Sequence, residues 1–248
     1  MKTDSIYVVD GARTPFLKSK NRPGPFGAAD LATQAGRTLL ARQKFAPDEL
    51  DEVILGCAAP SVDEVNIGRV AALRMGCGQK VPGWTVMRNC ASGMQALDSA
   101  ISNILAGKSE LVLAGGVDAL SRAPLLYNDK MVLWFSDLAS TKTTAQRIAA
   151  FGKLPVRALL APVIGIMKGL TDPMVGLLMG QTAENLAQRF GITREMQDAF
   201  SVRSHQRVIS SQKNGYLAAG GGEVEALFDT KGNPFLLDDG VRADASVA

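Results

Sequence analysis

Cys90 is the side chain best suited to covalent chemistry, and it lies in the stretch VMRNCASGMQALDSA, residues 86–100. Residues 84–87 predict a strand, and residues 93–106 predict a helix because apolar side chains recur there at helical spacing. At such a corner the first N–H groups and the dipole of the helix favour a thiolate. The pattern therefore predicts a nucleophile, and the alternative is a small buried hydrophobe, the commoner role of a free cysteine.

The other residues that carry chemistry are few. Cys57, Cys77 and Cys90 are odd in number and widely spaced, with no CxxC or Cys/His pair, so neither a zinc site nor a disulfide framework is predicted. The number and spacing of these cysteines fit the reduced thiols of a cytoplasmic protein better. The single histidine, His205, lies in a predicted helix with no metal-ligand spacing, and we interpret it as a surface residue. We expect no metal site, and the sequence offers Cys90 no obvious histidine base.

Strands and helices alternate through the first 120 residues. Predicted strands cover residues 5–10, 51–59 and 83–89, and another begins at residue 111; the predicted helices begin near Asp30, Val65 and Gly93. This alternation, with continuous apolar runs in the strands, predicts an α/β fold with a mostly parallel sheet.

The pattern changes after residue 120. Two helices are clear there, one over residues 181–190 and one that starts at Thr193 and ends before Gly215. We expect residues 1–120 to form an α/β domain and residues 121–248 to form an inserted, mainly helical domain that covers a site.

Composition excludes several classes of protein. The 27 Lys and Arg residues exceed the 24 Asp and Glu residues by only three, too few to indicate nucleic acid as a partner. The most apolar tract, residues 154–170, is broken by prolines and flanked by charges, so we expect it in a core or an interface rather than a membrane. The N-terminus has no apolar signal core, which favours a cytoplasmic location.

Six stretches, in order along the chain, together resemble the thiolase family of acyl-CoA acyltransferases. They are DGARTPF, NCASGMQALDSA, AGGVDALSRAP, MGQTAENLA, TREMQDAFSVRSHQR and DDGVRADASVA. The resemblance implies a layered α/β fold of two similar halves, with a loop domain that covers coenzyme A inserted in the first half. This chain matches the first βαβαβ half and the loop domain, and the second half is absent from it.

The resemblance also implies an activity. A 3-oxoacyl-CoA and coenzyme A would give acyl-CoA and acetyl-CoA, or the reverse, through an acyl-enzyme on Cys90, as in fatty acid metabolism and β-oxidation. Leu178 and Met179 resemble residues that line the pantetheine and acyl path, and Arg242 resembles a basic residue at the nucleotide end. Coenzyme A is then a substrate, and no permanently bound cofactor is implied.

The chain departs from the family pattern in what it lacks. It has no Gly-His-Pro histidine, no Asn-Glu loop and no Cys-x-Gly-Gly-Gly turn. We therefore expect a fragment that needs a C-terminal half for activity, whether it is a truncation, a cleavage product or a natural subunit. The expected partners are a separate C-terminal half and further copies of the chain, as a dimer or tetramer.

Two other functions remain open at this stage. One is a noncatalytic protein that binds acyl-CoA or lipid, which the missing base favours and the intact NCASG motif opposes. The other is a condensing enzyme similar to ketoacyl synthases, which also use a cysteine; the insertion with MGQTAENLA argues for a thiolase instead.

Overall fold

The computed structural model describes residues 5–20, 22–220 and 223–247. It contains two compact units, one formed by Met1–Arg122 with Thr193–Ala248 and the other by Ala123–Ile192. The first segment ends at Arg122, beside the domain boundary expected at residue 120. The expected second domain, residues 121–248, is divided between the two units, because residues 193–248 pack with the first part of the chain.

The centre of the first unit is a parallel sheet of three strands in the order β2-β1-β3. Its strands are β1 (Glu52–Gly56), β2 (Gly83–Val86) and β3 (Val112–Gly116). In the register, Ile54 lies opposite Trp84 on one side and Ala114 on the other. The predicted α/β class and the parallel sheet are confirmed. Because the strands are parallel, their carboxyl ends lie along one edge of the sheet.

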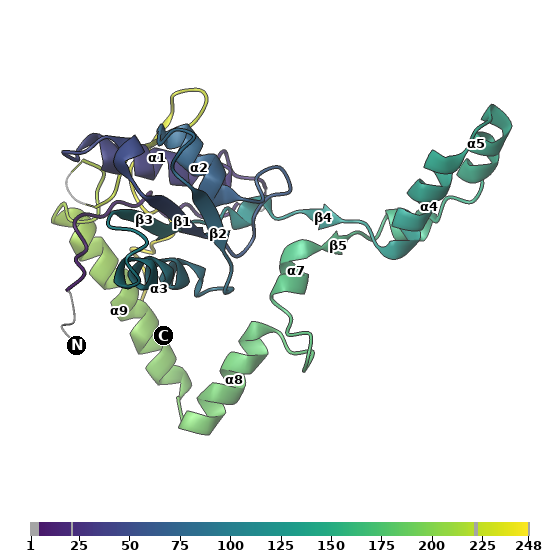
Figure 1. The fold of residues 1–248 in the computed structure, drawn as a ribbon. Helices are drawn as coiled ribbons and strands as arrows, with labels where there is room; N and C mark the ends of the chain where they lie inside the picture. Colours follow the sequence, from purple (N-terminus) through teal and green to yellow (C-terminus); the bar gives the residue numbers. More distant parts are fainter. Residues whose placement is uncertain (1–4, 21, 221–222, 248) are drawn as a thin grey trace. The chain divides into compact units, whose positions relative to one another are not determined.

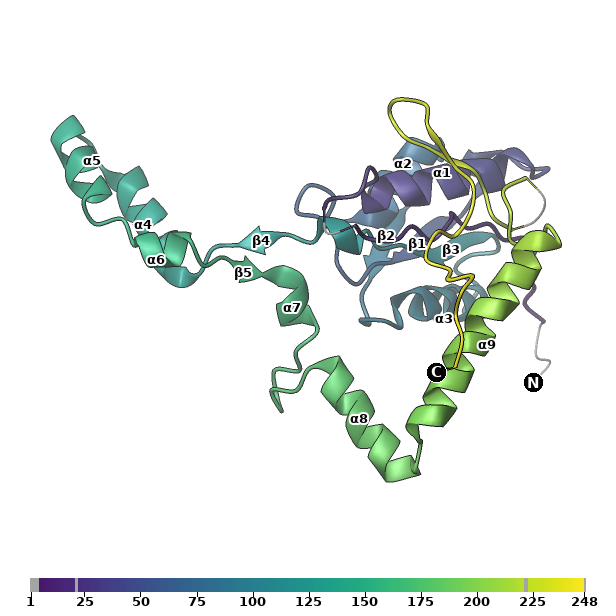
Figure 2. The same cartoon turned by 180° about the vertical axis from the view of Figure 1, so that it is seen from behind.

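Helices cover both faces of this sheet (Figures 1 and 2). On one face lie α1 (Ala28–Ala41) and α2 (Ile67–Met75), and on the other lies α3 (Ser92–Leu105). Local signals set the ends of α2: the Asn66 side chain accepts from the Arg69 N–H, and Gly76 takes the left-handed conformation after the last turn.

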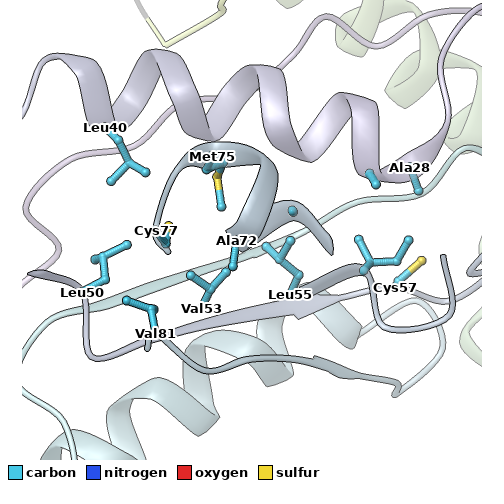
Figure 3. Packing of buried hydrophobic residues seen from close by; sticks show 13 residues of the cluster. Ala28, Leu40, Leu50, Val53, Leu55, Cys57, Ala72, Met75, Cys77 and Val81 are labelled. Atoms are coloured by element: carbon cyan, nitrogen blue, oxygen red, sulfur yellow. The ribbon is translucent and has the colours of Figure 1, made fainter. Parts of the chain in front are cut away.

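The larger core lies between the sheet and the pair α1 and α2 (Figure 3). Val53, Leu55 and Cys57 project into it from β1 and from the residue after it. The smaller core lies on the α3 side, where Ile54 packs against Ala96 and Ala100. Successive strand residues thus serve opposite layers, as the two-residue period of a strand requires.

Residues 5–10 form no strand in the structure, so the first predicted strand is wrong there. The apolar run is present, but Tyr7, Val8 and Val9 are each at least 75% exposed. A strand needs a hydrogen-bonded neighbour, and within the described residues the sheet ends at β2 and β3.

The rest of the first unit is less regular. It comprises two 3-10 turns, one long helix and a short antiparallel pair: η1 (Pro47–Glu49), η2 (Leu120–Arg122), α9 (Arg194–Lys213), β6 (Leu227–Phe228) and β7 (Pro234–Phe235). The predicted helix after Thr193 is confirmed, with the Thr193 side chain accepting from the Met196 N–H at its start.

The second unit is built of short elements. They are β4 (Leu125–Leu126), α4 (Asp129–Ser140), α5 (Thr144–Phe151), α6 (Val156–Leu159), β5 (Val163–Ile164), α7 (Gly165–Gly169) and α8 (Met179–Phe190). Its core is small and consists of Met131, Trp134 and Ala158. The apolar tract 154–170 was expected in a core or an interface, but within this unit Ala158 is its buried residue and Leu160 is 76% exposed.

Candidate active site

Cys90 lies in a tight turn between β2 and α3. The preceding residue, Asn89, has φ of 47°, a left-handed conformation that asparagine adopts more readily than most residues. The buried Ser92 hydroxyl donates to the Asn89 carbonyl oxygen at 2.7 Å and accepts from the Arg88 N–H at 2.8 Å. One side chain therefore fixes the backbone on both sides of Cys90.

Glycines bring the start of α3 onto the sheet. A Cβ atom on Gly56, the last residue of β1, would lie 2.2 Å from the backbone carbonyl carbon of Ser92. A Cβ atom on Gly116, the last residue of β3, would lie 2.9 Å from the Cα atom of Gly93. Backbone therefore packs on backbone at the carboxyl ends of two strands, which is possible only without side chains. This contact places the Cys90 turn at that edge of the sheet.

The other end of α3 is held by a buried carboxylate. Glu52 accepts hydrogen bonds from the Trp84 indole at 2.9 Å, the Asn103 amide at 2.7 Å and the Ser109 hydroxyl at 2.8 Å. Burial by itself would raise the pKa of Glu52, but these three donors outweigh burial and lower it. The helix is thus fixed at both ends relative to the sheet.

The helix start presents backbone donors. In the part of the chain that the structure describes, no acceptor is recorded for the N–H groups of Gly93 and Met94 in the first turn of α3. Unpaired N–H groups and the helix dipole together favour a negative charge at this end. Both a thiolate and the oxyanion formed when a thiolate attacks a carbonyl carry such a charge.

The three cysteines lie in different surroundings. Burial, and next the Asp118 carboxylate, raises the pKa of Cys57 to about 12, and burial raises the pKa of Cys77. Both thiols therefore stay protonated at neutral pH. Cys90 is exposed. Exposure is at odds with the role of a small buried hydrophobe and leaves Cys90 as the cysteine that a substrate in solution can reach.

The remaining predicted residues lie in different places. Leu178 and Met179 belong to the second unit, where they begin α8 with their side chains partly exposed. Arg242 belongs to the first unit with Cys90, and its backbone N–H donates to Nδ1 of His205 at 3.3 Å. Among the described residues of the first unit, no hydrogen bond joins Cys90 to Arg242. His205 is half-buried rather than a free surface residue, because the 242 segment lies on it.

Sequence reasoning missed the residues that position Cys90. These are Asn89, Ser92, Gly56 and Gly116, and none of them carries the chemistry itself. The available signal was the density of small residues at the ends of two strands and at the start of a helix, in ILGCAA, NCASG and AGG. Such a pattern is typical of elements whose backbones touch.

Two further properties of the described residues bear on the site. Among the described residues, His, Cys, Asp and Glu form no group of three or more that could hold a metal ion. Likewise, none of the helices described combines the length and the apolar character needed to cross a membrane.

The fold and the turn define a member of the thiolase family, and the chain belongs to it. The family model described as "Thiolase, N-terminal domain" matches residues 6–220. This range contains Cys90, Leu178 and Met179 and ends before Arg242. The predicted resemblance to the first half of a thiolase is confirmed.

Individual relatives agree with the family model. The 3-ketoacyl-CoA thiolase of Salmonella newport (strain SL254) is 32% identical over 246 residues, which are 99% of this chain and 55% of that protein. The chain therefore spans about half the length of the curated relatives it matches.

Two solved structures are similar in fold. The Bacillus anthracis acetyl-CoA acetyltransferase superposes with a TM-score of 0.74 and 29% identity over 96% of this chain and 55% of its own. Human mitochondrial 3-ketoacyl-CoA thiolase, solved in complex with CoA, gives 0.77 and 28% identity over 95% of this chain and 54% of its own.

Proposed function

We propose that this chain is the nucleophile-bearing part of an acyl-CoA thiolase. It would accept an acyl group from an acyl-CoA or 3-oxoacyl-CoA onto Cys90, and a C-terminal half would complete the turnover. The observation that supports this most directly is the exposed Cys90 in a fixed turn at the start of α3. Because the chain belongs to the thiolase family, we assign thioester chemistry to that thiol.

The proposed step follows from the geometry of the turn. With an acyl-CoA as the donor, the Cys90 sulfur, as thiolate, forms a bond to the thioester carbonyl carbon, and the carbonyl oxygen becomes an oxyanion. The N–H groups at the helix start, including that of Cys90, stabilise this charge. The bond to the coenzyme A sulfur then breaks, and coenzyme A leaves as a thiolate that takes up a proton from solvent. Division of the reaction through an acyl-enzyme lowers the barrier of each step.

The substrate contacts are proposed for three other residues. Leu178 and Met179 would contact the pantetheine and acyl part, which suits the partly exposed apolar side chains at the start of α8. Arg242, whose side chain is exposed, would face the phosphates at the nucleotide end. Arg242→Ala should then weaken coenzyme A binding about tenfold. Calorimetry with coenzyme A and with pantetheine, which lacks the nucleotide, tests this, because pantetheine binding should not change.

The acyl-enzyme is tested by intact mass spectrometry of the full chain before and after brief exposure to acetyl-CoA. One added acetyl group is expected, on the peptide that contains Cys90. Cys90→Ala should remove this modification completely. Cys77→Ala is the matched control, because Cys77 is buried and its thiol stays protonated.

Two results would contradict the proposal. The first is acetylation that persists in Cys90→Ala, which would show reaction at another group. The second is an unmodified wild-type chain that binds acetyl-CoA as tightly as Cys90→Ala does, which identifies a noncatalytic acyl-CoA-binding protein. The same assay with a separately produced C-terminal thiolase half shows whether complete turnover needs it.

A further inference from the structure

Three stretches that lie far apart in the sequence meet in the first unit. Residues 10–16, DGARTPF, contact residues 238–242, DDGVR, and these in turn contact α9, which contains most of TREMQDAFSVRSHQR. Of all these residues, the proposed function uses Arg242 alone. The contacts that surround Arg242 assign a role to the loop at residues 10–16 as well.

The strongest of these contacts is an ion pair between Arg13 and Asp238. The two terminal nitrogens of Arg13 hydrogen-bond the two carboxylate oxygens of Asp238 at 2.8 and 3.0 Å, and the Phe16 N–H donates to the same carboxylate at 2.7 Å. Burial by itself would raise the pKa of Asp238, but Arg13 and the Phe16 N–H lower it below its usual value. The Asp238 side chain is only 10% exposed, so its charge depends on Arg13.

Arg13 is itself held in place. Its backbone N–H donates to the Glu223 carbonyl at 2.8 Å, and its carbonyl accepts from the Glu225 N–H at 2.8 Å. Its guanidinium also lies 4.9 Å from the centroid of the Phe16 ring. Arg13 is therefore a fixed point to which the segment at residues 238–242 can be attached.

The helix α9 holds the same segment from another side. The Gln212 side chain donates to the Asp238 carbonyl at 3.3 Å, and Nδ1 of His205 accepts from the Arg242 N–H at 3.3 Å. The backbone is thus attached at both ends of residues 238–242, while the Arg242 side chain remains exposed.

We infer that Arg13 is a positioning residue for the nucleotide end of coenzyme A, because it fixes, through Asp238, the segment that presents Arg242. A flexible segment would have to become ordered on binding the phosphates, which weakens binding, whereas a segment fixed in advance does not. The inference rests on the contact between Arg242 and coenzyme A in the proposed function. It assigns Arg13 no contact with the ligand.

The test measures the affinity of the full chain for coenzyme A and for pantetheine by calorimetry. Arg13→Gln should weaken coenzyme A binding about fivefold, less than the roughly tenfold loss expected for Arg242→Ala, because Arg242 is still present. Pantetheine binding should not change, which a general loss of structure would not allow. Asp238→Asn breaks the same ion pair, keeps an acceptor for the Phe16 N–H, and should give the same result.

A double variant separates positioning from direct contact. In the Arg242→Ala background, Arg13→Gln should cause no further loss of affinity, because the residue that Arg13 positions is absent. Arg74→Gln is the matched control. Arg74 also belongs to the first unit and pairs with two carboxylates, those of Asp30 and Glu64, so its loss should leave both affinities unchanged.

Trypsin cleavage after Arg242 gives a second measurement, which needs no ligand. It should become about tenfold faster in Arg13→Gln, because a protease cuts a segment that opens locally. Cleavage after Lys231 is the internal reference. Asp229 holds that turn by accepting from the N–H groups of Lys231 and Asn233, so its rate should not change.

Several results would overturn the inference. These are wild-type affinity of Arg13→Gln for coenzyme A, an equal loss of pantetheine binding, losses that add in the double variant, or unchanged cleavage after Arg242. Failure of the proposed function looks different, since Arg242→Ala would then bind coenzyme A as the wild type does. In that case the cleavage rates still decide whether Arg13 holds the segment.

Discussion

The two compact units differ in how their helices are stabilised. In the first, α1, α2 and α3 each bury residues against a shared sheet. In the second, β4 and β5 are two-residue strands, and the core comprises three residues. Its helix α8 buries none of its residues. Local signals define α8 instead: the Gln181 side chain accepts from the Leu178 N–H at its start, and Gly191 is left-handed at its end.

This difference separates two contributions to helix stability, local capping and burial in a core. Caps and helix propensity are worth about 1 kcal/mol each and can specify where a helix begins and ends. Burial of a core supplies most of the free energy that keeps an element folded. We therefore expect the first unit to unfold at higher denaturant concentration than the second, and four variants test this comparison.

Gly56→Ala should have the largest effect. The new Cβ atom would overlap the backbone of Ser92, so α3 must leave the sheet, and the first unit should lose about 5 kcal/mol or more of stability. Gly115→Ala is the matched control, because its Cβ atom would meet only a Leu55 side-chain carbon at 3.6 Å. Urea unfolding followed by circular dichroism measures both. Equal stability of the two variants would refute the close packing of α3.

Trp134→Ala should come next, with an effect confined to the second unit. Trp134 donates to the Ala150 carbonyl at 2.9 Å and packs against Phe135 and Phe151. Its removal should cost the second unit about 3–5 kcal/mol. The chain has two tryptophans, so Trp84 alone reports on the first unit in this variant. A shifted Trp84 fluorescence transition would show that the two units unfold together, against the comparison.

Glu52→Gln should have an intermediate effect, about 1–3 kcal/mol in the first unit, because an amide satisfies the three donors poorly. The wild-type contribution should depend on pH. Because the folded pKa of Glu52 is lowered, its stabilisation is present above the unfolded value of about 4.3 and is lost as pH falls through the folded value. Urea midpoints between pH 7 and pH 3 should converge for wild type and variant. If the two midpoints stay equally far apart over this pH range, the lowered pKa of Glu52 is contradicted.

Thr143→Ala should have the smallest effect. The Thr143 hydroxyl caps α5 by accepting from the Gln146 N–H at 3.3 Å. Its loss should destabilise the second unit by about 1 kcal/mol. With Trp84→Phe as the background, Trp134 fluorescence measures that unit alone, and Thr143→Ser should restore the wild-type midpoint. If serine fails to restore it, the methyl group rather than the cap is responsible.

The sequence predicted an element correctly where the spacing of its apolar residues matches the surfaces that the element buries. The strands at β1, β2 and β3 and the helices between them were predictable, because their apolar residues match the layers that cover them. Residues 5–10 carry the same apolar pattern, yet a strand also needs a neighbour, which no periodicity reveals. The helices α5 to α7 were missed because elements of eight residues or fewer leave a weak periodic signal. The helix α4 was missed although it is as long as the predicted α8.

The site shows the same limit. Cys90 could be found from its type and from the helix that follows it. The left-handed conformation of Asn89 and the role of the Ser92 hydroxyl could not be found in this way. Neither a backbone conformation nor a hydrogen bond between residues three apart has a signature in composition. The glycines Gly56 and Gly116 act through the absence of a side chain, which becomes meaningful only when the facing backbone is known.

The contrast between one exposed and two buried cysteines makes the folded chain a ready-made molecule for single-site labelling. A maleimide dye should attach at Cys90 alone, with no other residue mutated, and the count of labelled thiols should rise from one to three on denaturation. The same difference in exposure determines which cysteine is oxidised when the protein is stored in air. Oxidation should link two chains through Cys90, and a reducing agent should return them to single chains without disturbing either core.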